Sequence, residues 1–249
     1  MSIIQKIVVD LKGQLKKRAP NLTKEQRTRM LKIINPDVSD YVIYGMKLSE
    51  IEKIVKNVFA SYNCEYDDSV EIFKILIRTN NEEEQFAGIF FLNRFKKHFN
   101  EQIIRLFKNE FSKYCHTWSL CDSTCIRVIG PFLGKKGNEN LAKKVINDWS
   151  ESENMWIQRA SMVILIKIIM IKKDFDDSYL FDLIEKMLNY RNQKYVEKGI
   201  GWLLKTCSKV KPDLTFNYLL ENKYRLSRVI LRYASEKLPN EKRMEILKK

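Results

Sequence analysis

A short segment near the middle of the chain places a tryptophan and an aspartate four residues apart. In the run TWSLCD at 117–122, Trp118 and Asp122 have the spacing that puts two side chains on one helical face. Leu120 and Cys121 fall on another side, which we expect to face the core. An ionised carboxylate beside an aromatic ring, with few polar neighbours, needs a cationic partner to offset its lost hydration. Asp122 is therefore a candidate site residue.

The same segment also fits a purely structural interpretation. Ser119 precedes Asp122 by three residues, which is the spacing of a capping box. In a capping box, the hydroxyl and the carboxylate satisfy backbone N–H groups at the start of a helix. The local sequence alone favours this role for Asp122.

A second candidate site lies on the helix expected over 193–209. Its apolar stripe is centred on Ile200, Leu203 and Cys207. The opposite side carries a tryptophan among four lysines, namely Trp202 with Lys194, Lys198, Lys205 and Lys209. An indole ring among lysines is suited to bind a polyanionic ligand whose stacked rings or sugars can lie over it. The alternative is a tryptophan packed on a neighbouring helix, with the lysines forming a solvated face.

Two other patterns predict no chemistry. Cys115, His116, Cys121 and Cys125 lack the paired CxxC spacing of zinc sites, so we expect no metal, and we expect no cofactor. The run GPFLGKK at 130–136 has short glycine spacing, no hydroxyl residue after its lysines and no preceding strand. It predicts a turn between helices instead of a phosphate-binding loop.

The charge balance favours an anionic partner. The chain has 45 Lys and Arg against 31 Asp and Glu, a formal net charge of +14. Such a surplus attracts the backbone of nucleic acid, although it also suits anionic membranes or acidic proteins. Five cysteines form no even framework, so we expect a reducing compartment and a cytoplasmic protein. The longest apolar run, 160–171, is cut by Lys167 and is shorter than the ~20 residues of a membrane span.

Apolar residues recur at helical spacing almost everywhere, and only eight Gly and five Pro interrupt them. Paired helices are expected near 141–150 and 155–172, 178–190 and 193–208, and 213–222 and 225–237. Their period is close to the ~40 residues of HEAT-like arrays. The sequence therefore predicts an all-α solenoid of antiparallel helix pairs with a concave basic face, built as one domain over 1–249. An ordinary antiparallel bundle is the alternative.

Three segments resemble signature segments of the AlkD-type DNA alkylation repair proteins, which are HEAT-like DNA glycosylases. They are TWSLCD at 117–122, NMWIQRA at 154–160 and EKGIGWLLK at 197–205. YGMKLSEI at 44–51 and LSRVILRYASEKLP at 226–239 fit the family more loosely. The similarity runs over most of the chain in the correct order and is weakest in the N-terminal third.

The resemblance implies hydrolysis of the glycosidic bond of N3- or N7-alkylated purines in duplex DNA. Asp122 matches the family's catalytic carboxylate, and Trp118 and Trp202 match the aromatic pair that cradles the deoxyribose of the lesion. Arg159 matches a basic residue near the DNA backbone. We expect DNA contacts from Arg159, Lys194, Lys198, Lys205, Lys209 and Arg228. The family leaves the damaged base stacked, whereas most enzymes that act on bases flip them. Ser119 stands where a second acidic residue is often seen, which bears on the substrate range.

One carboxylate is sufficient for this chemistry. An N-alkylated purine is cationic and leaves without protonation, so the remaining need is to stabilise an oxocarbenium-like sugar. Asp122 would do so electrostatically and orient the attacking water. Each tryptophan face would add about 1 to 2 kcal/mol where water is excluded.

Two alternatives share the same fold: a catalytically silent DNA-binding protein and a helical-repeat adaptor for acidic proteins. The presence of Asp122 with both tryptophans favours the enzyme, and the lysines around Trp202 favour nucleic acid over an adaptor. We therefore expect a monomer that binds duplex DNA containing alkylated bases and does not bind membranes.

Overall fold

The computed structural model describes residues 1–38, 40–190 and 193–248, and these residues form helices joined by short turns. The only β-type pairing among them is an isolated bridge between Val42 and Asn81. The predicted all-α class is confirmed. The chain divides into two compact units, Met1–Thr124 and Cys125–Lys249. The single domain and the concave basic face stay predictions.

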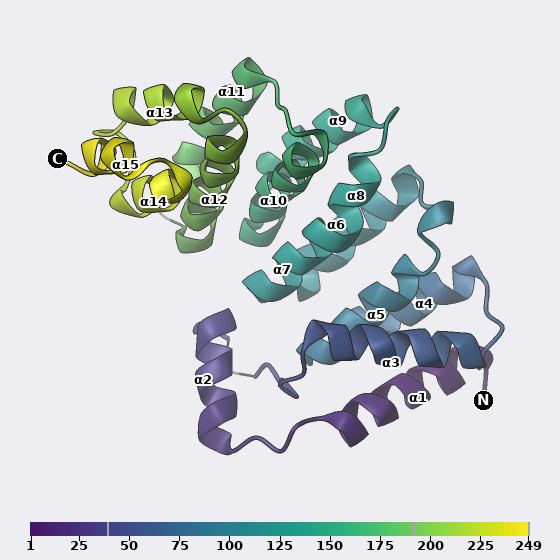
Figure 1. Ribbon diagram of the computed structural model, residues 1–249. Coiled ribbons are helices and arrows are strands. Elements are labelled where there is room, and N and C mark those ends of the chain that lie inside the picture. The colour runs from purple at the N-terminus through teal and green to yellow at the C-terminus, as the bar shows by residue number, and fades with distance from the viewer. Residues whose placement is uncertain (39, 191–192, 249) are drawn as a thin grey trace. The chain divides into compact units, whose positions relative to one another are not determined.

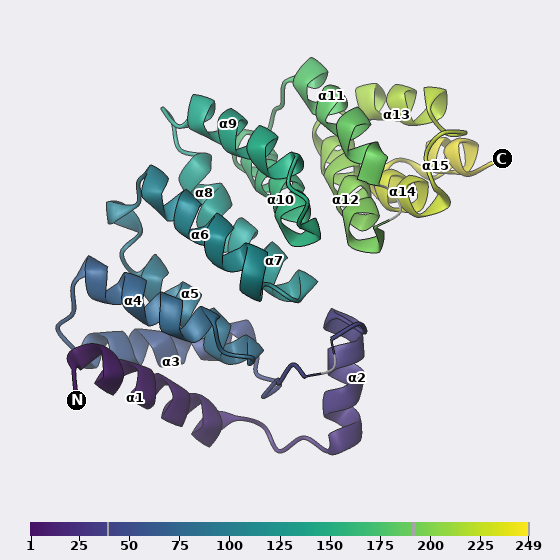
Figure 2. The ribbon, with the colours of Figure 1, turned by 180° about the vertical axis from the view of Figure 1, so that it is seen from behind.

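The first unit is built on four helices that share an apolar core. α1, α3, α4 and α5 lie beside one another in both ribbon views (Figures 1 and 2). Leu11, Ile54, Phe73 and Phe91, one from each of these helices, are fully or almost fully buried. The helices of this unit are α1 (Ile3–Arg18), α2 (Lys24–Ile34), α3 (Leu48–Ser61), α4 (Tyr66–Ile77), α5 (Glu82–Asn93), α6 (Glu101–Tyr114) and α7 (Trp118–Thr124). A short 3-10 turn, Lys96–His98, precedes α6.

Helix α2 differs from the others because none of its residues is buried. It stands to the side of α1 and α3 in Figure 1. Side-chain hydrogen bonds tie its end to other parts of the unit. The Trp118 indole donates to the Ile33 carbonyl at 2.9 Å, and the Asn35 amide donates to the His116 carbonyl at 2.5 Å. Polar contacts therefore help to hold α2 against the rest of the unit.

The second unit begins with a π-helical turn, Cys125–Ile129, and continues as stacked helices. These are α8 (Gly130–Leu133), α9 (Glu139–Ser150), α10 (Met155–Lys172), α11 (Asp177–Met187), α12 (Lys194–Val210), α13 (Pro212–Glu221), α14 (Arg228–Ala234) and α15 (Asn240–Leu247). The turn expected over 130–136 is wrong in its first half, because residues 130–133 are helical and the turn begins only at Gly134. The antiparallel pairs α9–α10 and α11–α12 match the predicted ones closely, whereas α13 and α14 both pack against α12.

Two glycines let α12 lie close to two of its neighbours, α10 and α14. A Cβ atom on Gly199 would lie 2.6 Å from Cε of Met162 in α10. A Cβ atom on Gly201 would lie 2.7 Å from Cβ of Tyr233 in α14. Because Tyr233 Cβ is fixed to the α14 backbone, that helix would have to move to accept any larger residue at 201. The GIG run of the sequence thus has a packing role.

We expect Gly201→Ala to lower the free energy of unfolding by about 1 kcal/mol or more, since overpacking outweighs the gain in helix propensity. Urea denaturation measures the change. The matched control is Gly13→Ala, at a helical glycine of α1 with no atom within 4 Å of its added Cβ. There the same substitution should raise stability by about 0.5 to 1 kcal/mol. Equal effects at the two sites would contradict the packing role.

No helix in the described part of the chain combines the length and the apolar composition that a membrane crossing requires.

Candidate functional site

Helix α7 begins at a buried threonine. The Thr117 side chain is fully buried, and its hydroxyl oxygen accepts a hydrogen bond from the Leu120 backbone N–H at 3.1 Å. This is the contact of an N-cap residue. Ser119 therefore lies inside the first turn of α7, and the capping box expected for Ser119 and Asp122 is wrong. The cap is a hydroxyl residue two positions earlier than the one expected.

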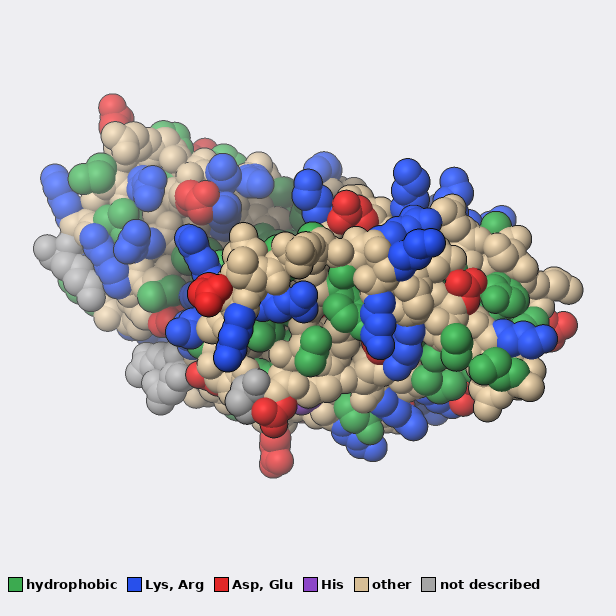
Figure 3. Space-filling model, turned by 90° about the horizontal axis from the view of Figure 1, so that it is seen from below, with side chains coloured by type: hydrophobic (Ala, Val, Ile, Leu, Met, Phe, Trp, Pro, Cys, Tyr) green, Lys and Arg blue, Asp and Glu red, His purple; other side chains and the backbone are tan. Residues whose placement is uncertain are grey.

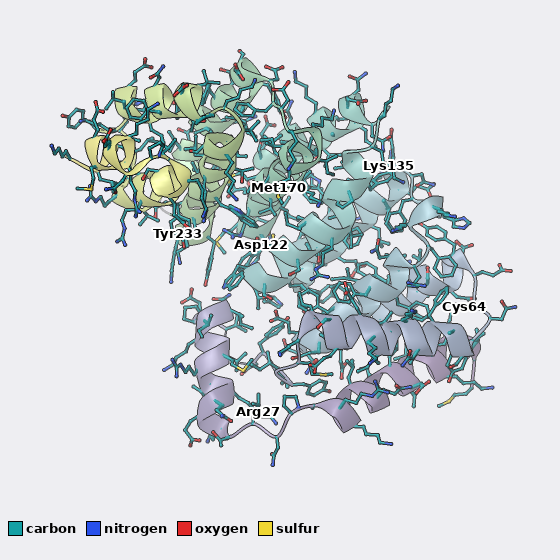
Figure 4. The ribbon with its side chains drawn as sticks, viewed as in Figure 1. Arg27, Cys64, Asp122, Lys135, Met170 and Tyr233 are labelled. Carbon is teal, nitrogen blue, oxygen red and sulfur yellow. The ribbon has the colours of Figure 1, made fainter. Side chains whose placement is uncertain are left out.

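Asp122 lies in α7 (Figure 4). It comes one turn after Trp118, and only 8% of its surface is exposed. The core side predicted for this helix is confirmed, because Leu120, Cys121 and Thr124 are fully buried. Trp118 is half-buried, and its indole is oriented by the hydrogen bond to Ile33 in α2. The structure thus presents a largely desolvated carboxylate beside a fixed aromatic ring on one face of one helix.

Three consecutive glutamates at the start of α5 are buried within the first unit. Glu82, Glu83 and Glu84 are 5%, 4% and 6% exposed. The Glu83 carboxylate accepts backbone N–H bonds from Tyr44 at 2.8 Å, Gly45 at 2.6 Å and Met46 at 3.1 Å. Sequence analysis missed this cluster, because a run of acids is typical of a solvated surface.

The Glu84 carboxylate also binds the loop at 44–46, through the side chain of Tyr44. The Tyr44 hydroxyl donates to its carboxylate at 2.9 Å, and the ammonium of Lys12 in α1 lies 2.9 Å from its other oxygen. Asn81 caps α5 by accepting a bond from the Glu84 N–H at 2.9 Å. Buried carboxylates with several donors of this kind order the backbone around them.

In the second unit, α12 has the two faces expected from its helical wheel. Ile200, Leu203 and Cys207 are fully buried, and Trp202 is half-buried. On the polar side, Lys194 and Lys209 are exposed, whereas Lys198 and Lys205 are partly covered. The Lys205 ammonium lies 2.6 Å from a carboxylate oxygen of Glu236, so its charge already has a partner within the unit.

Arg159 is more deeply buried than a residue that contacts DNA at the protein surface would be. It is 6% exposed, and its guanidinium donates to the Tyr195 carbonyl in the first turn of α12 at 2.5 Å. Burial lowers the pKa of Lys198, and the positive charges of Lys194 and Arg159 lower it further. Three cations thus gather at the N-terminal end of α12. An anion bound there would relieve their repulsion.

Arg228, the remaining basic site residue, is exposed at the start of α14. Its guanidinium donates a hydrogen bond to the Leu247 carbonyl at the end of α15. That contact is structural and leaves the predicted DNA contact of Arg228 untested.

The basic surplus is uneven along the chain. Residues 125–249 contain 25 Lys and Arg against 15 Asp and Glu, whereas residues 1–124 contain 20 against 16. Most of the net charge therefore belongs to the second unit. Lys and Arg side chains are prominent on the face shown in Figure 3. Among the residues described, no group of three or more His, Cys, Asp and Glu side chains could hold a metal ion.

Two solved structures share this fold over most of the chain. A "predicted DNA alkylation repair enzyme" from Enterococcus faecalis is 18% identical, with a TM-score of 0.69 over 88% of this chain and 97% of that one. AlkD2 from Streptococcus mutans is 19% identical, with a TM-score of 0.54 over 88% of this chain and all of that one. A search of curated proteins finds no match. The sequence model described as "DNA alkylation repair enzyme" matches residues 11–238, so the chain belongs to this family, whose role is the repair of alkylated DNA.

Proposed function

We propose that the protein is a DNA glycosylase that excises N3- or N7-alkylated purines from duplex DNA by hydrolysing the N-glycosidic bond. The observation that carries this proposal is the desolvated carboxylate of Asp122 beside the oriented ring of Trp118 on α7. With Thr117 as the helix cap, Asp122 has no capping role there to explain its burial.

The chemistry follows from the charge of the substrate. An alkylated purine leaves as its glycosidic bond breaks, and positive charge develops on the deoxyribose. Asp122 stabilises that charge and orients the water that attacks the sugar carbon. Trp118 and Trp202 offer π faces to the same cation. No general acid is needed, because the leaving base is already cationic.

DNA binding is assigned to the basic residues of the second unit. Lys194, Lys198 and Lys209 lie on the polar face of α12, and the charges of Lys194 and Arg159 both act on Lys198. Lys205 contributes less, because Glu236 already neutralises it. Lys198 is therefore the best residue for a test, since its burial and its cationic neighbours both favour an anionic ligand.

We expect Lys198→Glu to weaken binding to undamaged duplex DNA similarly for all sequences, because a phosphate contact carries no base information. The slope of log affinity against log salt concentration should become shallower by about one unit. Fluorescence anisotropy at several salt concentrations measures both effects. Lys144→Glu, on the exposed side of α9, makes the same change in net charge and is the control. Equal losses in both variants would assign the effect to net charge instead of the α12 face.

The decisive experiment is incubation of the protein with duplex DNA containing 7-methylguanine, followed by an assay for abasic sites. The proposal expects abasic sites only in the alkylated duplex. Salt-dependent binding without excision would indicate a silent DNA-binding protein. The absence of binding would favour an adaptor for acidic proteins.

A further inference from the structure

Helix α2 ends where Asn35 is followed by Pro36. The ring of a proline pushes the residue before it out of the helical region, and Asn35 has extended backbone angles, with a φ of −164° and a ψ of 109°. The carbonyl groups in the last turn of α2 are therefore not taken up by a following turn of helix. They are acceptors that other segments of the chain can use.

The side-chain amide of Asn35 takes the backbone N–H that would otherwise bond to Ile33. In a continued α-helix, the Asp37 N–H would donate to the Ile33 carbonyl, four residues earlier. It donates instead to Oδ1 of Asn35 at 3.0 Å. The Ile33 carbonyl accepts the indole N–H of Trp118 at 2.9 Å. Asn35 thus leaves open the acceptor that orients the Trp118 ring.

The NH₂ group of the same amide binds the chain just before α7. It donates to the His116 carbonyl at 2.5 Å. Asn35 is only 7% exposed, so water competes little for this bond. His116 is followed by Thr117, the cap of α7, and then by Trp118. The amide therefore joins the end of α2 to the start of α7, two residues before the ring.

Two restraints together set the orientation of the Trp118 ring: the position of its backbone and the partner of its indole N–H. Trp118 is half-buried, so water can replace the Ile33 carbonyl, and a single bond of this kind orients the ring only weakly. The bond is retained while the Ile33 carbonyl and the backbone before α7 keep their separation. The Asn35 amide holds both, because it contacts the chain after Ile33 and the chain before Trp118.

We propose that Asn35 is a positioning residue: its amide couples the end of α2 to the start of α7 and thereby holds the Trp118 ring in the orientation set by the Ile33 carbonyl. A developing sugar cation requires a fixed ring face, since a cation is attracted to the face of an aromatic ring and not to its edge. The effect on catalysis rests on the proposed function, whereas the coupling between Asn35 and Trp118 does not.

The best variant for a test is Asn35→Asp, because it keeps the size of the side chain and the oxygen that accepts the Asp37 N–H. It replaces the NH₂ group by a second oxygen, which faces the His116 carbonyl and repels it. Asn35→Ala removes both contacts without adding charge and is the neutral second variant. The control is Asn222→Asp at the end of α13, where the lost bond is to the Tyr218 carbonyl of the same helix.

The first measurement needs no catalysis. The chain has four tryptophans, and the indole N–H signal of Trp118 in ¹H–¹⁵N spectra is the one that disappears in Trp118→Phe. In Asn35→Asp and Asn35→Ala, we expect this signal to shift and its exchange with water to become about three- to tenfold faster, as the loss of one hydrogen bond implies. Asn222→Asp should leave the Trp118 signal unchanged.

The second measurement is single-turnover excision of 7-methylguanine at saturating enzyme. We expect Asn35→Asp to be slower than the wild type by about tenfold, the size of effect that a small misplacement of a catalytic group produces. In the Trp118→Phe background, which has no indole N–H, the same substitution should slow excision by less than about threefold, because residues that act through one another are not additive. Asn222→Asp should match the wild type.

An unchanged Trp118 signal in the Asn35 variants would overturn the inference, as would equal rate losses with and without the Trp118 indole. If Asn35→Asp does not fold, Asn35→Ala decides by the same two measurements. If the wild type excises nothing, the proposed function fails, and the exchange of the Trp118 indole N–H alone then decides whether Asn35 holds the ring.

Discussion

We expect Asp122→Asn to lower the single-turnover rate of 7-methylguanine excision by roughly 10² or more, the usual effect of removing a preorganised electrostatic group. Asparagine keeps the shape of the side chain and much of its hydrogen bonding, but it removes the negative charge that stabilises the sugar cation. DNA affinity should persist or rise, because a carboxylate near the phosphodiester backbone is repulsive in the ground state. Rapid-quench kinetics and anisotropy measure the two quantities separately.

The control for this substitution is Asp182→Asn, at an exposed position of α11, which should leave both rate and affinity unchanged. Thermal unfolding separates catalysis from structure. The hydroxyl of Thr117 caps α7, so loss of the Asp122 charge should not fray that helix. Excision at the wild-type rate by a variant that only melts earlier would make Asp122 a structural residue. The catalytic assignment would then have to be abandoned.

The helical architecture could be predicted because it depends on local spacing. The helix expected over 155–172 is α10 with the same bounds, since its apolar residues recur at helical intervals without a break. The helix expected over 225–237 is shorter at its start, because the Ser227 hydroxyl caps α14 by accepting a bond from the Ile230 N–H. Boundaries set by a single hydroxyl contact are harder to predict than the helices themselves.

The contacts of the candidate site residues are mostly long-range, and local spacing carries no information about them. Lys205 pairs with Glu236, and Arg159 donates to the Tyr195 carbonyl. Each contact joins different helices. Neither the helical wheel that placed Lys205 on a polar face nor the resemblance that singled out Arg159 could reveal these partners. The same reason hid the role of the Glu82–Glu84 run, whose partners include loop residues near position 44.

The second large effect that we expect is on stability, and it concerns the loop at 44–46. Glu83→Ala should lower the free energy of unfolding by about 3 to 5 kcal/mol, because it removes a buried carboxylate that satisfies three backbone N–H groups. The Gly45 N–H is the closest of the three, at 2.6 Å. Gly45 has a φ of 84°, which favours glycine, and this conformation is part of the turn that presents the three donors to one carboxylate. Urea denaturation measures the loss.

Two variants make this prediction sharper. Glu83→Gln should be intermediate, because one amide oxygen can still accept from Gly45 and Met46 while the NH₂ group faces the Tyr44 N–H. Glu71→Ala, which removes an exposed carboxylate paired with Lys74 on the same helix, should cost less than about 1 kcal/mol. If Glu83→Ala were as mild as Glu71→Ala, the loop at 44–46 would be held mainly by other contacts. The Tyr44 hydroxyl bond to Glu84 would then be the first to test, because it reaches the same loop from the next residue of α5.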